Sequence, residues 1–176
     1  MSGHNKWSKI KRKKAAGDAE KSRQFSKISR LITAESKKCG GLITSPSLAT
    51  AIETAKAANM PKDTVERAIK KGTDTNVAAM ESVTYEAYGP GGVAIVIEGL
   101  TDNRNRAAQE VRHALAKSGL EMAGQGAASW AFKKGAGGWE PTVTVPINET
   151  ASAALEALIE SLESLDDVQD VFVNAE

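Results

Sequence analysis

Six basic residues within nine positions near the amino terminus surround a single tryptophan, Trp7, and no acidic residue occurs among the first fourteen positions. Moving so many like charges out of water is costly unless each charge is paired, so this segment is expected to stay hydrated and to bind external negative charge. Nucleic-acid phosphate is the leading source of such charge. The basic side chains are Lys6, Lys9, Lys11, Arg12, Lys13 and Lys14.

The net charge of the whole chain conceals a strong asymmetry. In total, 23 Lys and Arg oppose 22 Asp and Glu, which leaves a formal charge of +1. Residues 1–72 hold 17 basic and 6 acidic side chains, residues 73–134 hold 6 and 7, and residues 140–176 hold none and 9. Such a gradient is typical of a binder that is oriented electrostatically on a polyanion. The alternative is that the two ends of the chain pair with each other.

Trp7 has two possible roles, which the sequence does not separate. Its ring can stack on an exposed base, as aromatic side chains in basic arms do, or it can anchor the arm on the folded domain behind it. Direct reading of base edges needs a helix that carries Asn, Gln or Arg side chains into a groove, and only Arg23 and Gln24 are candidates. The sequence therefore favours recognition of shape and backbone, which suits structured RNA better than a short DNA operator.

A second anion site is conceivable at the segment Asn103–Arg106, where a helix start would combine with the guanidinium groups of Arg104 and Arg106. Asp102 lies in the same turn and would repel an anion. Helix capping with ordinary surface charge is therefore the stronger interpretation of this segment.

The remaining polar motifs predict no catalytic centre, metal site or cofactor. The segment Gly89–Gly92 is read as a hairpin turn, because it lacks the Lys and Ser or Thr that complete a phosphate-binding loop. The neighbouring Asp166 and Asp167 are expected to be solvated rather than to hold a divalent ion. His4 and His113 have no visible catalytic partner, and the lone Cys39 excludes an intrachain disulfide.

The chain shows neither a signal peptide nor an apolar run long enough to span a membrane, so we expect a cytoplasmic protein. With 176 residues, 41% of them hydrophobic, it can bury a substantial core in one large domain or two small ones.

Hydrophobic periodicity predicts a three-helix bundle over residues 18–72, behind a flexible basic arm at 1–17. The first helix, 18–38, places Ile28 and Ile32 in an apolar sector and ends at Gly40. A Ser45 hydroxyl is expected to cap the second helix, and the third is expected to run to Gly72. The basic surface of the arm continues along the first helix through Arg23, Lys27, Arg30 and Lys37.

After a linker at 73–82 the periodicity changes to two, which predicts an α/β sandwich over 83–176. Strands are expected at 83–88, 93–97, 128–132, 142–147 and 168–173, and helices after Asp102 or Asn103 and around residues 155–165. The order ββαβ–βαβ predicts an α+β fold with helices on one face of a mainly antiparallel sheet.

The chain resembles the YebC family, which also includes the mitochondrial translational activator of cytochrome c oxidase. Matching segments occur in order along nearly the whole chain: Gly3–Lys11, Ala58–Thr64, Tyr88–Ala94, Thr101–Arg106, Ser129–Phe132 and Leu165–Val171. One departure is clear, since family members usually carry a further α/β lobe at the position that residues 135–140 bridge here.

The resemblance implies a non-enzymatic role in gene expression with a nucleic-acid partner, and neither a small-molecule substrate nor a membrane. Three functions remain open. The first is a translation factor that acts with the ribosome or its RNA, and the second is a DNA-binding transcriptional regulator. The third and most remote is a small phosphoryl-cleaving enzyme that uses Arg104 and Asn105.

Overall fold

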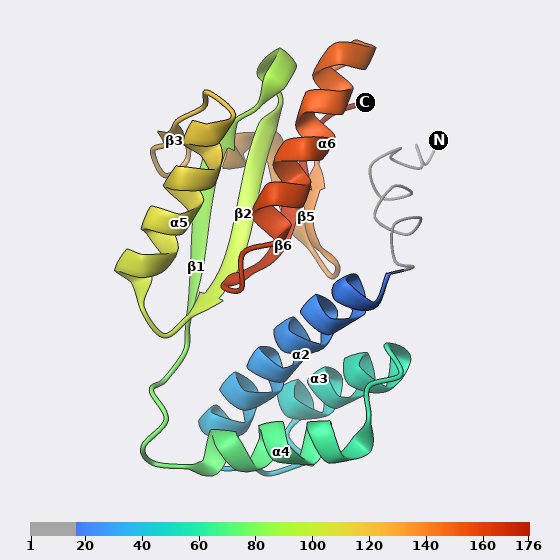
Figure 1. Cartoon of the computed structure of the whole chain (residues 1–176), viewed down its shortest axis with the longest axis vertical. Helices are drawn as coiled ribbons and strands as arrows, with labels where there is room; N and C mark the ends of the chain where they lie inside the picture. Colours follow the sequence, from blue (N-terminus) through green and yellow to red (C-terminus); the bar gives the residue numbers. More distant parts are fainter. Residues whose placement is uncertain (1–16) are drawn as a thin grey trace. The chain divides into compact units, whose positions relative to one another are not determined.

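The structure is a computed structural model that describes residues 17–176 (Figure 1). The described chain forms two compact units. The first, which we call the helical unit, extends to Glu81, and the second, the α/β unit, runs from Ser82 to Glu176.

The helical unit consists of α2 (Asp18–Cys39), α3 (Pro46–Ala57) and α4 (Lys62–Thr73). Gly40 ends α2 in the left-handed conformation, at φ 62°, which glycine adopts without steric cost, and this confirms the predicted end of the helix. Pro46 occupies the first turn of α3, but Ser45 makes no side-chain capping bond, so the expected hydroxyl cap is wrong. The core is formed by Ile28, Ile32, Leu48, Ala51, Ala55, Met60, Val65 and Ala68.

Small and hydroxyl side chains allow α2 and α4 to approach closely. The Ser36 hydroxyl donates to the carbonyl of Ile69 at 2.7 Å, and the Thr33 hydroxyl donates to that of Ala68 at 3.2 Å. A Cβ atom at Gly72 would lie 2.5 Å from the Thr33 carbonyl oxygen. Gly72 therefore serves this close approach, and the expectation that it closes the helix is wrong because α4 continues to Thr73.

The α/β unit contains two sheets. A four-stranded sheet has the order β3-β1-β2-β6, in which β3 pairs antiparallel with β1 and β6 pairs antiparallel with β2. A separate hairpin joins β4 to β5. The elements in chain order are β1 (Glu81–Tyr88), η1 (Pro90–Gly92), β2 (Ala94–Thr101), α5 (Arg104–Lys117), β3 (Met122–Ala123), η2 (Ser129–Ala131), β4 (Phe132–Gly135), β5 (Gly138–Pro141), α6 (Glu149–Glu163) and β6 (Val168–Val173).

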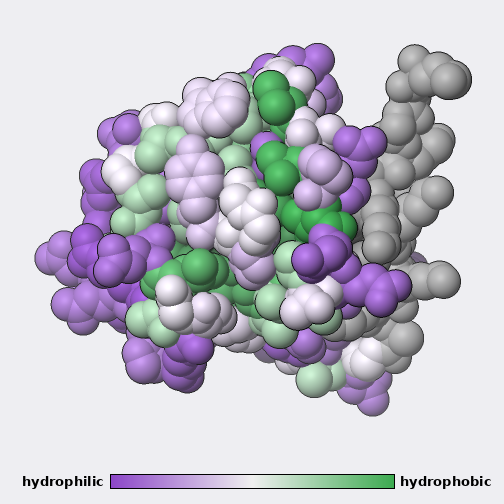
Figure 2. All heavy atoms as spheres, turned by 90° about the horizontal axis from the view of Figure 1, so that it is seen from above, coloured by the Kyte–Doolittle hydropathy of each residue, from purple (hydrophilic) through white to green (hydrophobic). Residues whose placement is uncertain are grey.

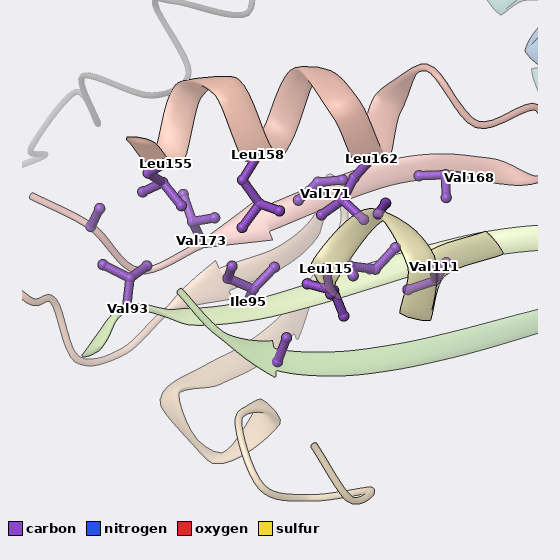
Figure 3. Close-up of a cluster of buried hydrophobic side chains, with 14 residues drawn as sticks. Val93, Ile95, Val111, Leu115, Leu155, Leu158, Leu162, Val168, Val171 and Val173 are labelled. Atoms are coloured by element: carbon purple, nitrogen blue, oxygen red, sulfur yellow. The ribbon is translucent and has the colours of Figure 1, made fainter. Parts of the chain in front are cut away.

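Both faces of the larger sheet are covered. On one face α5 and α6 pack against the strands through a core that includes Ile95, Leu115 and Leu158 (Figure 3), as the predicted α+β sandwich requires. On the other face Ala94 and Val96 pack against residues of η2 and of the β4–β5 hairpin. This second covering layer was not predicted.

Two predicted strands do not form. Residues 128–132 contain the short helix η2 instead, and residues 142–147 make only an isolated parallel bridge between Val145 and Ala175. The backbone groups at the start of the second segment do not join a sheet. The N–H groups of Thr142 and Val143 both donate to the carbonyl of Ala131. The glycine-rich joint at 135–138 is the turn of the β4–β5 hairpin, where Gly138 has φ 108°.

Candidate nucleic-acid interface

Of the predicted nucleic-acid-binding residues, only those on α2 belong to the described part of the chain. Lys6, Trp7, Lys9, Lys11, Arg12, Lys13 and Lys14 lie outside the described residues. Arg23 is exposed, whereas Lys27 and Arg30 are half-buried and each has an interaction partner. The predicted basic face of α2 is therefore open at Arg23 and partly engaged further along the helix.

The amino-terminal turns of α2 are exposed around the helix. Residues 21–24 are all exposed, and the first buried residue of the helix is Ile28. Lys21 and Arg23 form no ion pair with any other residue of the described chain. This end of α2 directly follows the basic segment in the sequence and adds two available cations to it.

A second group of cations lies at the carboxyl ends of α2 and α4. These ends are adjacent, since a Cβ atom at Gly41 would meet the methyl group of Thr73 at 2.7 Å. Lys70 and Lys71 are exposed there, and neither pairs with a carboxylate between residues 17 and 176. Cations at this position also interact favourably with the helix dipole.

Lys37 has a structural role instead. Its Nζ donates to the carbonyl of Asp74 at 3.2 Å and to that of Val77 at 2.5 Å, so the ammonium group fastens the chain that follows α4 onto α2. Three further basic residues, on α3 and α4, form exposed pairs within their own helices, which are Lys56–Glu53 at 2.7 Å, Lys62–Glu66 at 3.6 Å and Arg67–Asp63 at 3.2 Å. The described helical unit thus has four cations without an ion-pair or hydrogen-bond partner for the charged group in the described chain, which are Lys21, Arg23, Lys70 and Lys71.

The segment proposed as a second anion site is already occupied by carboxylates. Arg106 donates from Nη2 to Asp102 at 2.7 Å and to Asp167 at 2.9 Å. The hydrogen bond to Asp167 and then that to Asp102 raise the pKa of Arg106 further above its ordinary value. Of the two predicted capping residues, Asp102 and Asn103, it is Asn103 that caps α5, by accepting from the backbone N–H of Arg106.

Asp167 is only 3% exposed, and it also accepts from the Thr101 hydroxyl at 2.8 Å, so the expectation of a solvated carboxylate is wrong at this position. Arg104 is exposed on α5, and its carbonyl accepts from the Tyr85 hydroxyl. Arg106 therefore ties α5 to the chain before β6, and the backbone of Arg104 contacts β1.

The structure also reveals a buried carboxylate that the sequence did not single out. Glu86 is 4% exposed and accepts three backbone N–H bonds, from Gly126 at 2.8 Å, Ala128 at 2.6 Å and Ser129 at 2.8 Å. Burial raises the pKa of Glu86, but these hydrogen bonds together outweigh it, so the pKa lies below its ordinary value. The period-two pattern of β1 places Glu86 on the face of the strand that Ala87 does not share. Nothing in the neighbouring sequence indicates that the segment 126–129 covers that face.

Across residues 17–176 no three His, Cys, Asp or Glu side chains gather in a way that could hold a metal ion. None of the helices in this range is both long and apolar enough to cross a bilayer.

A helical unit followed by an α/β unit of this architecture also occurs in a solved protein. The crystal structure of a conserved hypothetical protein, Aq1575 from Aquifex aeolicus, matches with a TM-score of 0.80 and 32% sequence identity. The match covers 90% of this chain and 91% of that one. The two proteins therefore share one class of two-part α+β fold.

Sequence comparisons identify the family within this class. The model of the TACO1/YebC protein N-terminal domain matches residues 5–75, and that of the TACO1/YebC second and third domain matches residues 80–137. The chain belongs to the TACO1/YebC family, which confirms the resemblance seen in its motifs.

Two relatives illustrate the similarity. A protein from Petrotoga mobilis is 45% identical over the whole of this chain and 71% of its own length. One from Fervidobacterium nodosum is 47% identical over 96% of this chain and 68% of its own length. Both are named "Probable transcriptional regulatory protein".

Proposed function

We propose that this protein is a non-enzymatic regulator of gene expression that binds nucleic acid through its helical unit and the basic segment before it. The observation that carries the proposal is the exposed amino end of α2, where Lys21 and Arg23 have no carboxylate partner in the described chain. Cations of this kind release condensed counterions when they meet phosphate, which drives binding to nucleic acid. The names of the relatives also support a regulatory role.

We favour RNA of the translation apparatus as the target. On α2, the exposed side chains of the Arg, Asn and Gln types that read base edges are Arg23 and Gln24, which is a small set for sequence recognition in a major groove. Binding that depends on phosphates and shape suits folded RNA, where grooves and unpaired bases vary more than in duplex DNA. A translation factor that acts with the ribosome or its RNA fits this chemistry.

DNA-binding transcriptional regulation is the second candidate. It is favoured by the relatives' names and by the exposed pair Arg23 and Gln24, because an exposed helix end of this type can enter a major groove. The two candidates share the same cationic surface and differ in the polymer that it contacts.

A charge-neutralising variant tests the role of α2. The double variant Lys21→Gln/Arg23→Gln should bind a folded ribosomal RNA fragment about tenfold more weakly at low salt, and the slope of log affinity against log salt should fall by about one per lost phosphate contact. The matched control is Lys56→Gln/Lys62→Gln, which removes two cations that already pair with Glu53 and Glu66. Equal affinity of the two double variants would contradict the proposal.

The arm is tested in the same titration. Replacing Lys11, Arg12, Lys13 and Lys14 with Gln should weaken binding by an amount that shrinks as salt rises. Unchanged affinity at low salt would exclude a role for these residues.

The choice of polymer is tested by capture from lysate. The tagged protein is recovered with and without RNase, and the bound nucleic acid is sequenced. Enrichment of ribosomal RNA that RNase abolishes would support the translation factor, and promoter DNA that survives RNase would support the transcriptional regulator.

A further inference from the structure

The large apolar side chains that the α/β unit exposes lie together. Tyr88 is 39% exposed, Trp130 is 62% exposed and Val143 is 46% exposed. Trp130 donates from Nε1 to the Tyr88 hydroxyl at 3.0 Å, and the N–H of Val143 bonds to Ala131, the residue that follows Trp130. We call these three residues the aromatic platform. Figure 2 shows one face of the molecule, on which hydrophobic residues in green and intermediate residues in pale shades are interspersed with hydrophilic residues in purple.

Hydrogen bonds within the α/β unit fix the segment that carries Trp130. Glu86 binds the backbone N–H groups of Gly126, Ala128 and Ser129, and thereby fixes the segment that carries Trp130. The Tyr88 hydroxyl donates to the carbonyl of Ala127, on the same segment. A surface that is ordered before binding loses little conformational entropy when a partner docks on it.

The hydrogen-bonding groups of the two rings are used within the protein. The indole N–H of Trp130 is bound to Tyr88, and the Tyr88 hydroxyl is bound to Ala127. What the platform offers to a partner is therefore ring surface, which attracts apolar groups and, through its quadrupole, cations.

The net charge of the α/β unit argues against a polyanion as the partner. Residues 82–176 hold 6 Lys and Arg against 14 Asp and Glu. Glu121 directly precedes β3, which pairs with the end of β1 at Ala87, and Glu176 accepts from the hydroxyl of Thr144, the neighbour of Val143. Both glutamates are exposed. Negative charge beside exposed aromatic rings repels phosphate and attracts ammonium and guanidinium groups.

We propose that the aromatic platform of Tyr88, Trp130 and Val143 is a docking surface for a protein partner that presents Arg side chains among apolar ones. Trp, Tyr and Arg dominate the binding energy of protein interfaces, and Arg stacks on aromatic faces more readily than Lys. This inference rests on the α/β unit alone and is independent of the nucleic-acid function proposed for the helical unit.

The experiment follows the indole N–H signals of the isotope-labelled full chain by NMR at physiological salt, with the Trp130 signal assigned through Trp130→Phe. The probe is a twelve-residue peptide of alternating Arg and Leu. We expect saturable shifts of the Trp130 signal in the wild type. When the affinity is measured for all variants by the fluorescence anisotropy of the dye-labelled peptide, we expect a loss of about five- to tenfold in Trp130→Ala and a smaller loss in Trp130→Phe, whose ring binds cations less strongly. Leu42→Ala removes an equally exposed side chain from the helical unit and should change nothing.

Two further probes decide between partners. A peptide with Glu in place of Arg, and a twelve-nucleotide oligouridylate, should each leave the Trp130 signal in place. Shifts with oligouridylate and none with the Arg peptide would replace the proposal with base stacking on an RNA. Peptide affinity that is the same in wild type and in a folded Trp130→Ala or Trp130→Phe variant would overturn it.

Discussion

The helical unit and the α/β unit handle charge in opposite ways. In the helical unit α2 and α4 meet through Gly72, Thr33 and Ser36, and the unpaired cations lie on the surface. In the α/β unit two carboxylates, Glu86 and Asp167, are buried among donors and hold separate segments together. A buried charge with several donors is a structural element, whereas an exposed charge without a partner is available for binding.

Removing the charge of a buried carboxylate should have the largest effect on the free energy of unfolding. Glu86→Gln keeps the shape of the side chain but places an NH₂ group against backbone donors, so the free energy of unfolding should fall by about 3 kcal/mol. Chemical denaturation followed by circular dichroism measures the change. Glu140→Gln, at an exposed residue that pairs with Lys133, should cost less than about 0.5 kcal/mol. Similar losses in both variants would show that the three N–H bonds are not what holds the segment.

The same carboxylate predicts a pH dependence. Its pKa in the folded protein lies below the ordinary value of 4.5, so its contribution to stability is complete above that value and is lost as the pH falls through the folded pKa. The difference in unfolding free energy between wild type and Glu86→Gln, measured from pH 7 down to pH 3, should therefore narrow once the pH falls below 4.5. A constant difference over this range would contradict the lowered pKa.

The close approach of α2 and α4 can be tested with a single methyl group. In Gly72→Ala the new Cβ would lie 2.5 Å from the Thr33 carbonyl oxygen and 2.6 Å from the Ser36 Cβ, so the helices must separate and the helical unit should lose about 2 kcal/mol. Gly17→Ala is the control, because its Cβ would meet no atom of the described residues 17–176 within 4 Å. Hydrogen exchange should locate the loss in the helical unit, and a uniform loss across both units would contradict this.

The smallest expected effect concerns Lys37. Lys37→Met keeps the aliphatic stem but removes both hydrogen bonds to the carbonyls of Asp74 and Val77, so stability should fall by no more than about 1 kcal/mol. Amide exchange at Asn76 and Val77 should accelerate while the helix cores stay protected. Lys38→Met, which removes only a surface pair with Glu35, should leave these amides unchanged.

Regular elements with a clear hydrophobic period could be predicted from the sequence. The apolar run of residues 93–97 predicts a central strand, and β2 lies inside the larger sheet between β1 and β6. The αL glycine after α2 and the Asn103 cap of α5 follow from local chemistry that neighbouring residues specify.

The two predicted strands that do not form, 128–132 and 142–147, have a common explanation. Residues 128–132 and 142–147 have strand-like composition, but their backbone groups bond to the Glu86 carboxylate, to Ala131 and to Asn174, which are distant in sequence. Nothing local distinguishes an N–H that joins a ladder from one that binds a side chain. The Tyr88–Trp130 pair escaped prediction for the same reason, since its partners are 42 residues apart.

The bond between Lys37 and Val77 shortens the tether between the two units. Only residues 78–80 separate this attachment point from the first residue of β1, and three residues extend to about 10 Å. Two weak contacts, one on each unit, would then act at a high effective concentration of one for the other. A target with one binding element for each unit would thus be bound more tightly than either contact alone allows.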